Sequence, residues 1–341
     1  MTERLLLRLS GEHPILPMLE AQRLFSRIDP KSKLESVGER LALVTTSLDA
    51  PRAEAVCRRL ALTREASRVI VTHADGGEVP AHLLDEVRDR TFLVRASGFG
   101  PSTPEAERLV GRRILEQAWL RGISTSVSVS RPGVVLLLSR TRAGDMISVL
   151  IETDTRSSCR ARAAARPFRH PVGIDPVIAR VMLNMAGVLA GESVLDPFCG
   201  TGSILVEAGM MGARIFGMDS DQRMIKGARR NLVALQPGRA FLVRGNALRS
   251  AATFRARFDH VVTDPPYGRS SPTMMDAAKL LSEFPATARE LLGRDGTLCI
   301  ASPSTIDLSD ELTRAGLILE AFVYQRVHGG LGRHLYVARR C

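Results

Sequence analysis

The segment Asp264-Pro265-Pro266-Tyr267-Gly268 places a carboxylate, two stiff residues and an aromatic ring in one short turn. An amino group on a nucleobase is a poor nucleophile because its lone pair is delocalised into the ring. Hydrogen-bond acceptors on its N–H groups turn the lone pair toward an electrophile, and Asp264 Oδ and the Pro265 carbonyl are two such acceptors. The prolines stiffen the turn by fixing φ, and Tyr267 offers a face for a base lifted from its stack. Alone, these residues also fit an ordinary turn.

A glycine-rich turn, Asp196-Pro-Phe-Cys-Gly-Thr-Gly202, lies between an apolar strand and an apolar helix. Such glycines let backbone N–H groups approach a ligand closely. No Gly-Lys-Ser/Thr follows, which excludes a P-loop, and the spacing differs from G-x-G-x-x-G. The next strand, Ala213–Met218, ends at Asp219, where an acid can accept hydrogen bonds from ribose hydroxyls. In this order, the features favour an amine-binding turn over an ordinary one.

The elements that must position these turns alternate along the second half of the chain. After a helix over Pro176–Leu189, the pattern from Glu192 is strand, glycine-rich turn, helix, strand and helix. This alternation predicts a parallel sheet with helices on both faces. Further strands over Ala240–Val243 and Phe258–Thr263 lead into Asn246-Ala247 and Asp264. Every ligand candidate therefore follows the carboxyl end of a strand, where open α/β sheets bind ligands.

The first half is predicted as a mixture of strands and helices. Helices are expected over Pro14–Phe25, Ala53–Leu62 and Thr103–Arg121. Strands are expected over Leu5–Leu9, Leu41–Thr46, Arg68–Thr72, Thr91–Ala96, Ser124–Ser130, Val134–Arg140 and Met146–Glu152.

Positive charge is concentrated in one connecting segment. The chain has 341 residues and a net charge of +11, which favours an anionic partner. Residues 155–171 hold five arginines and no acidic residue, with little apolar periodicity. We interpret the segment as an interdomain linker that contacts phosphates; a solvated linker is the alternative. The proposed RNA contacts are Arg156, Arg160, Arg162, Arg166 and Arg169.

Composition excludes several classes of protein. Hydrophobic residues make up 45% of the chain, as in ordinary globular proteins, and no apolar run reaches the roughly 20 residues that span a bilayer. The N-terminus lacks the apolar core of a signal peptide. The five cysteines are scattered without a C-x-x-C motif, which argues against a disulfide framework or a cysteine-rich zinc site. We therefore expect a cytoplasmic protein without a membrane association.

The second half resembles the class I S-adenosylmethionine-dependent methyltransferases that act on amino groups. More narrowly, Asp196-Pro-Phe-Cys-Gly-Thr-Gly-Ser-Ile-Leu-Val-Glu-Ala-Gly and Thr263-Asp-Pro-Pro-Tyr-Gly-Arg are similar to the archaeal tRNA (guanine-10-N2)-methyltransferases. The connector Arg166-Pro-Phe-Arg-His-Pro171 is similar to the family's entry into the catalytic domain. Phe92-Leu-Val-Arg-Ala and the stretch Val127–Ser139 resemble a THUMP module.

The resemblance implies an α/β fold: a Rossmann-like class I methyltransferase domain with a mostly parallel seven-stranded sheet, preceded by an α+β ferredoxin-like/THUMP region. The implied divisions are a ferredoxin-like lobe at 1–50, a THUMP-like RNA-binding domain at 51–153, an Arg-rich linker at 154–172 and the methyltransferase domain at 173–341.

The resemblance also implies the site residues. S-adenosylmethionine would be bound by Asp196, Phe198, Gly200, Gly202, Asp219, Asn246 and Ala247. Asp219 would hold the ribose. Asn246 stands where the family usually has an acid, and its amide oxygen can still accept from the adenine amino group. Asp264, Pro265 and Tyr267 would handle the target amine, without a metal.

The implied activity is methyl transfer to N2 of guanosine at position 10 of tRNA, once or twice. The implied partners are tRNA and a small zinc-binding activator subunit, in a monomer or a single heterodimer. Three alternatives stay open: a guanosine elsewhere in tRNA or in rRNA, adenine N6 in DNA, and a non-catalytic RNA-binding protein built on a methyltransferase fold.

Overall fold

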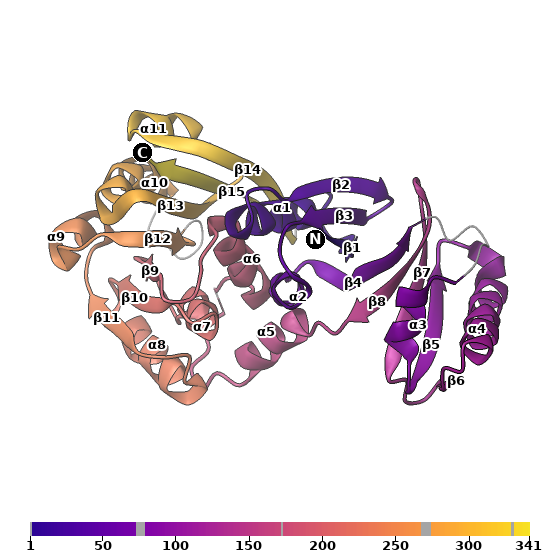
Figure 1. Ribbon diagram of the computed structural model, residues 1–341. Coiled ribbons are helices and arrows are strands. Elements are labelled where there is room, and N and C mark those ends of the chain that lie inside the picture. Colours follow the sequence, from indigo (N-terminus) through magenta and orange to yellow (C-terminus); the bar gives the residue numbers. More distant parts are fainter. Residues whose placement is uncertain (1, 73–78, 172, 267–273, 329–330) are drawn as a thin grey trace. The chain divides into compact units, whose positions relative to one another are not determined.

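The computed structural model describes residues 2–341 except 73–78, 172, 267–273 and 329–330 (Figure 1). It divides into two compact units. Unit 1 consists of residues 1–12 and 25–154, and unit 2 of residues 13–24 and 155–341. Helix α1 (Leu16–Ile28) therefore contributes residues to both units. Among the described residues, no helix is long and apolar enough to cross a bilayer.

Unit 1 is built on one eight-stranded sheet in the order β2-β3-β1-β4-β8-β7-β5-β6. Its strands are β1 (Glu3–Leu9), β2 (Lys33–Gly38), β3 (Leu41–Thr46), β4 (Thr63–Thr72), β5 (Arg90–Ser97), β6 (Thr125–Val127), β7 (Val134–Thr141) and β8 (Gly144–Ile151). Its remaining helices are α2 (Ala50–Cys57), α3 (Ala81–Val87), the 3₁₀ turn η1 (Gly100–Ser102) and α4 (Thr103–Leu120).

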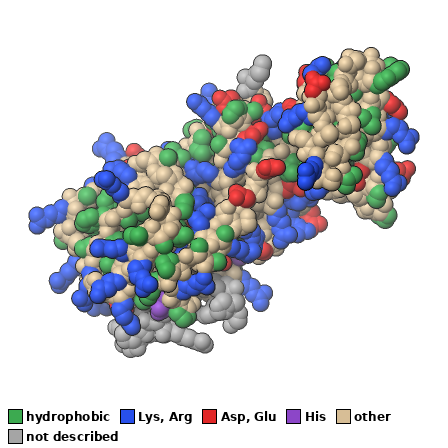
Figure 2. Space-filling view, turned by 90° about the horizontal axis from the view of Figure 1, so that it is seen from below, with side chains coloured by type: hydrophobic (Ala, Val, Ile, Leu, Met, Phe, Trp, Pro, Cys, Tyr) green, Lys and Arg blue, Asp and Glu red, His purple; other side chains and the backbone are tan. Residues whose placement is uncertain are grey.

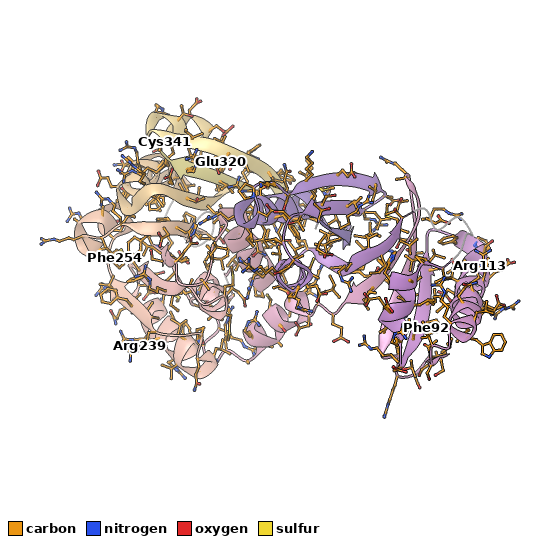
Figure 3. The ribbon with its side chains drawn as sticks, viewed as in Figure 1. Phe92, Arg113, Arg239, Phe254, Glu320 and Cys341 are labelled. Atoms are coloured by element: carbon orange, nitrogen blue, oxygen red, sulfur yellow. The ribbon has the colours of Figure 1, made fainter. Side chains whose placement is uncertain are left out.

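A single apolar cluster holds α3 and α4 on the sheet of unit 1. Phe92 of β5, labelled in Figure 3, is fully buried with Leu83 of α3 and Ile114 of α4. The opposite side of α4 carries Trp119, whose exposed fraction is 80%. A lone tryptophan in a helix is expected to pack in the core. Trp119 instead lies on the surface of α4.

Unit 2 contains a seven-stranded sheet in the order β11-β10-β9-β12-β13-β15-β14. Its strands are β9 (Ser193–Asp196), β10 (Arg214–Asp219), β11 (Ala240–Arg244), β12 (Phe258–Thr263), β13 (Leu292–Pro303), β14 (Leu317–His328) and β15 (Leu331–Arg340). The first five are parallel, and β15 pairs antiparallel with both β13 and β14. The mostly parallel seven-stranded sheet of the predicted α/β fold is confirmed.

Helices flank the sheet of unit 2. They are α5 (Thr155–Ala164), α6 (Pro176–Ala186), α7 (Ser203–Met210), α8 (Gln222–Leu235), the 3₁₀ turn η2 (Ala247–Arg249), α9 (Ser250–Phe254), α10 (Met274–Leu291) and α11 (Ser309–Arg314). Phe284 of α10 and Leu312 of α11 are fully buried in one cluster with Val261 of β12. Helix α6 is buried along almost its whole length and begins at Asp175, whose carboxylate caps its first turn.

The arginine-rich segment contains a helix that the sequence analysis did not predict. Residues 155–164 form helix α5, and Thr155 and Cys159 on its inner side are buried. A helix forms because the segment contains alanine and arginine, which are good helix formers, and no proline before Pro167. Its apolar periodicity is weak because the buried side of α5 also carries arginine.

Candidate active site

Three carboxylates lie at the carboxyl edge of the sheet in unit 2. Asp196 ends β9, Asp219 ends the neighbouring β10, and Asp264 follows β12 on the other side of β9. The negative charges of Asp219 and Asp264 both contribute to raising the pKa of Asp196, as expected of groups that lie close together. The structure therefore brings together the acids of the two turns.

Asp196 connects the glycine-rich turn to the end of β12. Its side chain is buried, and Oδ1 accepts hydrogen bonds from Phe198 N at 3.1 Å and Thr263 Oγ1 at 2.7 Å. Burial raises the pKa of Asp196 to about 7, against the lowering effect of these two hydrogen bonds. Since Thr263 directly precedes Asp264, one buried carboxylate fixes both turns.

The glycine-rich turn needs glycine at two positions. Gly200 has φ 49° and Gly202 has φ 83°, in the left-handed region that side chains disfavour. A Cβ atom at Gly200 would meet nothing within 4 Å, whereas at Gly202 it would lie 3.4 Å from the Ala228 Cβ. Gly202 thus also allows close packing against α8, while open space lies beside Gly200. Helix α7 begins directly after the turn.

Asp219 is held in place by the backbone around it. Its Oδ2 accepts from Gly200 N at 2.9 Å and its Oδ1 from Asp221 N at 2.8 Å. Burial raises the pKa of Asp219, although the backbone hydrogen bonds oppose the shift. A carboxylate oxygen can accept more than one hydrogen bond. Asp219 can therefore organise the turn and still accept from a ligand hydroxyl.

Three further predicted cofactor residues use their side chains within the protein. Asn246 is exposed, and its Oδ1 accepts from Leu248 N at 3.0 Å, which caps η2. The Ala247 side chain is buried in the apolar cluster. The Phe198 ring packs edge-on against Phe284, with centroids 5.1 Å apart. Any contact of Ala247 or Phe198 with a ligand would therefore come mainly from the backbone.

The proline turn carries a contact that the sequence did not reveal. Pro265 is buried and Asp264 is partly exposed. Arg333 of β15 donates a hydrogen bond from Nη1 to Asp264 Oδ2 at 3.2 Å. Tyr267, the predicted stacking residue, lies outside the described residues.

The arginines of the connector have different surroundings. Arg162 donates to both carboxylate oxygens of Glu207, at 2.9 and 2.7 Å. Arg166 is buried and donates to Ser203 Oγ, in the first residue of α7, at 2.6 Å. Their guanidinium groups face the protein interior, so the expectation of RNA contacts is revised for these two. Arg160 is exposed.

Arg166 also has unused donors next to the glycine-rich turn. In the described part of the chain, its Nε and Nη2 are buried without a hydrogen-bond partner. Burial lowers the pKa of Arg166, while the charge of Glu207 opposes that shift. A buried cation with two unused donors beside a helix N-terminus is a favourable environment for an anion.

Comparison with known proteins shows similarity to methyltransferases. Residues 163–334 match the model of the RMKL-like methyltransferase domain. The tRNA (guanine(10)-N2)-dimethyltransferase of Methanothermobacter thermautotrophicus is 33% identical over 347 residues, covering 97% of this chain and 98% of that protein.

A second relative carries a different positional name. The tRNA (guanine(6)-N2)-methyltransferase of Archaeoglobus fulgidus is 21% identical over 262 residues, covering 68% of this chain and 65% of that protein. Among solved structures, TrmN from Thermus thermophilus has a TM-score of 0.54 at 23% identity, covering 99% of this chain and 100% of that one. This structural similarity supports the fold.

Proposed function

Because the chain belongs to the S-adenosylmethionine-dependent tRNA guanine-N2 methyltransferases, we propose that it methylates N2 of guanosine at position 10 of tRNA. The observation that carries the proposal is the placement of Asp264 at the sheet edge beside Asp196 and Asp219. This arrangement puts an amine acceptor next to the residues suited to hold the methyl donor. The guanosine at position 10, as in the name of the Methanothermobacter relative, is part of the proposal.

The glycine-rich turn fits the proposed donor. The space beside Gly200 admits a ligand against the backbone, and Asp219 is suited to accept from ribose hydroxyls. The unused donors of Arg166 and the start of α7 suit a carboxylate. When bound, S-adenosylmethionine supplies a methyl carbon whose bond to sulfur breaks, with both electrons leaving on sulfur, as the N2 lone pair bonds to carbon.

The proline turn handles the amine. Asp264 and the Pro265 carbonyl accept hydrogen bonds from N2, which directs its lone pair away from the purine plane. After transfer, N2 carries one proton in excess, and the Asp264 carboxylate is the adjacent group that can accept it. A singly methylated N2 still has one N–H for these acceptors, so the same residues can support a second transfer.

Binding of tRNA is assigned to exposed cations and to unit 1. On the face of unit 2 at the left of Figure 2, Lys and Arg side chains are widespread and acidic side chains are few. Arg156, Arg160 and Arg169 are the proposed phosphate contacts of the connector, and residues 1–50 and 51–153 are proposed as the ferredoxin-like lobe and the THUMP-like domain. We propose the cytoplasm as the site of action.

The test uses purified full-length protein with S-adenosylmethionine and two tRNA transcripts that differ only by guanosine or adenosine at position 10. We expect N2-methylated guanosine by nucleoside mass spectrometry in the first transcript alone. Methylation of both transcripts would contradict position 10, and a third transcript with its guanosine at position 6 replaced tests the alternative suggested by the Archaeoglobus relative.

A matched pair of variants tests the site itself. Asp264→Ala is expected to abolish transfer with near-normal binding of donor and tRNA. Asp310→Ala, which removes an exposed carboxylate from α11, is expected to leave transfer unchanged. Size-exclusion chromatography of the active sample tests the expected monomer or single heterodimer, and its activity without added protein tests the need for a zinc-binding subunit.

A further inference from the structure

Arg333 lies on β15, an interior strand next to the edge of the sheet of unit 2. Strand β15 lies between β13 and β14, and in register Arg333 pairs with Pro303 on one side and Gln325 on the other. The residue is 7% exposed. Burial of a guanidinium group is costly unless it is paired, so an arginine in this position needs a specific partner.

That partner is Asp264. The pair joins Arg333 Nη1 to Asp264 Oδ2 at 3.2 Å, with exposed side-chain fractions of 8% and 18% respectively. Arg333 approaches across the end of β13, since β13 lies between β12 and β15. The cation is thus embedded in the sheet, while the carboxylate lies nearer the surface. A rigid partner of this kind can fix the rotamer of the group it binds.

Two buried polar atoms beside this contact have no hydrogen-bond partner among the described residues. In the described ranges, Arg333 Nε and the Oε1 atom of Gln325 are both buried and lack a hydrogen-bond partner. As directly paired residues of adjacent strands, the two side chains lie on the same face of the sheet. Asp264 is therefore the only described hydrogen-bond partner of the Arg333 guanidinium.

We propose that Arg333 is a positioning residue, which holds the Asp264 carboxylate in the orientation that accepts the hydrogen bond from the target amine. The inference rests on the proposed function, because it gives Arg333 a role only through Asp264. A single contact from Nη1 constrains one carboxylate oxygen directly. Loss of Arg333 removes this constraint on the Asp264 carboxylate, so the alignment of the amine suffers while the surfaces that bind tRNA and donor are unchanged.

The test measures methyl transfer to tRNA under single-turnover conditions, together with KM for tRNA and Kd for S-adenosylmethionine. Arg333→Gln is expected to lower the transfer rate roughly 10- to 100-fold, as loss of alignment does, with KM and Kd within about twofold. Arg333→Lys keeps a cation that can make one contact and should recover most of the rate. Arg339→Gln removes a partly exposed arginine of the same strand, which pairs with Asp295 and Glu320 and not with Asp264, and serves as the matched control.

A double-mutant cycle separates positioning from general structure. If Arg333 acts through Asp264, Arg333→Gln should cause no further loss in an Asp264→Asn background. Additive losses, or full activity of Arg333→Gln, would overturn the inference while leaving the proposed function intact. Full activity of Asp264→Asn would instead contradict the proposed function. If Arg333→Gln fails to fold, Arg333→Met, which keeps the length of the side chain without its donors, takes its place in the cycle, and the same criterion of non-additivity decides.

Discussion

Glu207 is completely buried, and Arg180 donates two hydrogen bonds to its Oε2 atom, at 3.0 and 2.7 Å. Arg162 of α5 completes the pairing of the carboxylate. Although burial pushes the other way, the hydrogen bonds from Arg162 and the charge of Arg180 lower the pKa of Glu207. The Glu207 carboxylate thus joins α5 and α6 to α7, the helix that follows the glycine-rich turn of the proposed donor site.

Replacement of Glu207 should destabilise unit 2. Glu207→Ala leaves two arginines without their buried partner and is expected to cost about 3–5 kcal/mol in the free energy of unfolding. Glu207→Gln keeps a hydrogen-bond acceptor and should cost less. Denaturant unfolding measures both. Equal losses in the two variants would show that the shape and the remaining acceptor of glutamine contribute nothing once the charge of Glu207 is removed.

A second buried pair tests how α1 is attached to unit 2. Asn184 Nδ2 donates to Glu20 Oε1 at 2.7 Å, and Glu20 is fully buried. Glu20→Ala is expected to lower the free energy of unfolding by about 1–3 kcal/mol, because it removes a buried hydrogen-bond partner. Glu39→Ala, at a highly exposed carboxylate, is the control and should change stability little. Similar melting curves for the two variants would contradict this prediction.

The pH dependence of stability should carry a contribution from Asp196. Burial raises the pKa of Asp196 from 3.8 to about 7 in the folded state, so the folded state binds its proton more tightly than the unfolded state. Its contribution to stability is present below the unfolded pKa and is lost as the pH rises through about 7, with a slope of at most about 1.4 kcal/mol per pH unit. Asp196→Asn should flatten this decline between pH 4 and pH 7. An identical slope in the variant would disprove it.

Arg166 and Arg160 should affect different ligands. Arg166→Gln is expected to raise the Kd of S-adenosylmethionine several-fold, because Arg166 is buried beside Ser203 and faces the turn rather than solvent. Arg160→Gln should leave that Kd unchanged and reduce the salt dependence of tRNA binding by about 0.9 in log–log slope, as for one lost phosphate contact. Calorimetry and filter binding measure the two quantities. A raised Kd of S-adenosylmethionine in Arg160→Gln, with a reduced salt dependence of tRNA binding in Arg166→Gln, would contradict these two roles.

Local sequence signals were sufficient to predict which three carboxylates lie at the carboxyl edge of the sheet in unit 2. Asp196, Asp219 and Asp264 each follow an apolar strand, so their positions depend only on strand order in a parallel sheet. The contact between Arg333 and Asp264 depends on the antiparallel insertion of β15 between β13 and β14, which joins residues 69 positions apart. No local periodicity encodes such a pairing, and the contact of Arg333 with Asp264 was therefore not predicted.

Weak or mixed periodicity explains the other differences. Strand β2 was not predicted because half of its residues are exposed and only Val37 is buried. The connector was interpreted from its charge and its weak apolar periodicity, which do not distinguish an arginine that faces solvent from one that pairs with a buried acid such as Glu207. The acid lies 45 residues beyond Arg162, so only the folded structure identifies the pair.

The assignment of residues 13–24 to unit 2 has a consequence for biosynthesis. On the ribosome, this stretch emerges before most of unit 1, yet Arg23 donates to Met185 O at 2.6 Å and to Glu320 Oε2, in a residue labelled in Figure 3, at 2.7 Å. Both partners are synthesised later than Arg23, and Glu320 lies close to the end of the chain. Helix α1 therefore cannot complete its contacts in unit 2 until strand β14, which contains Glu320, has been synthesised. We expect unit 2 to finish folding only after the chain is released from the ribosome.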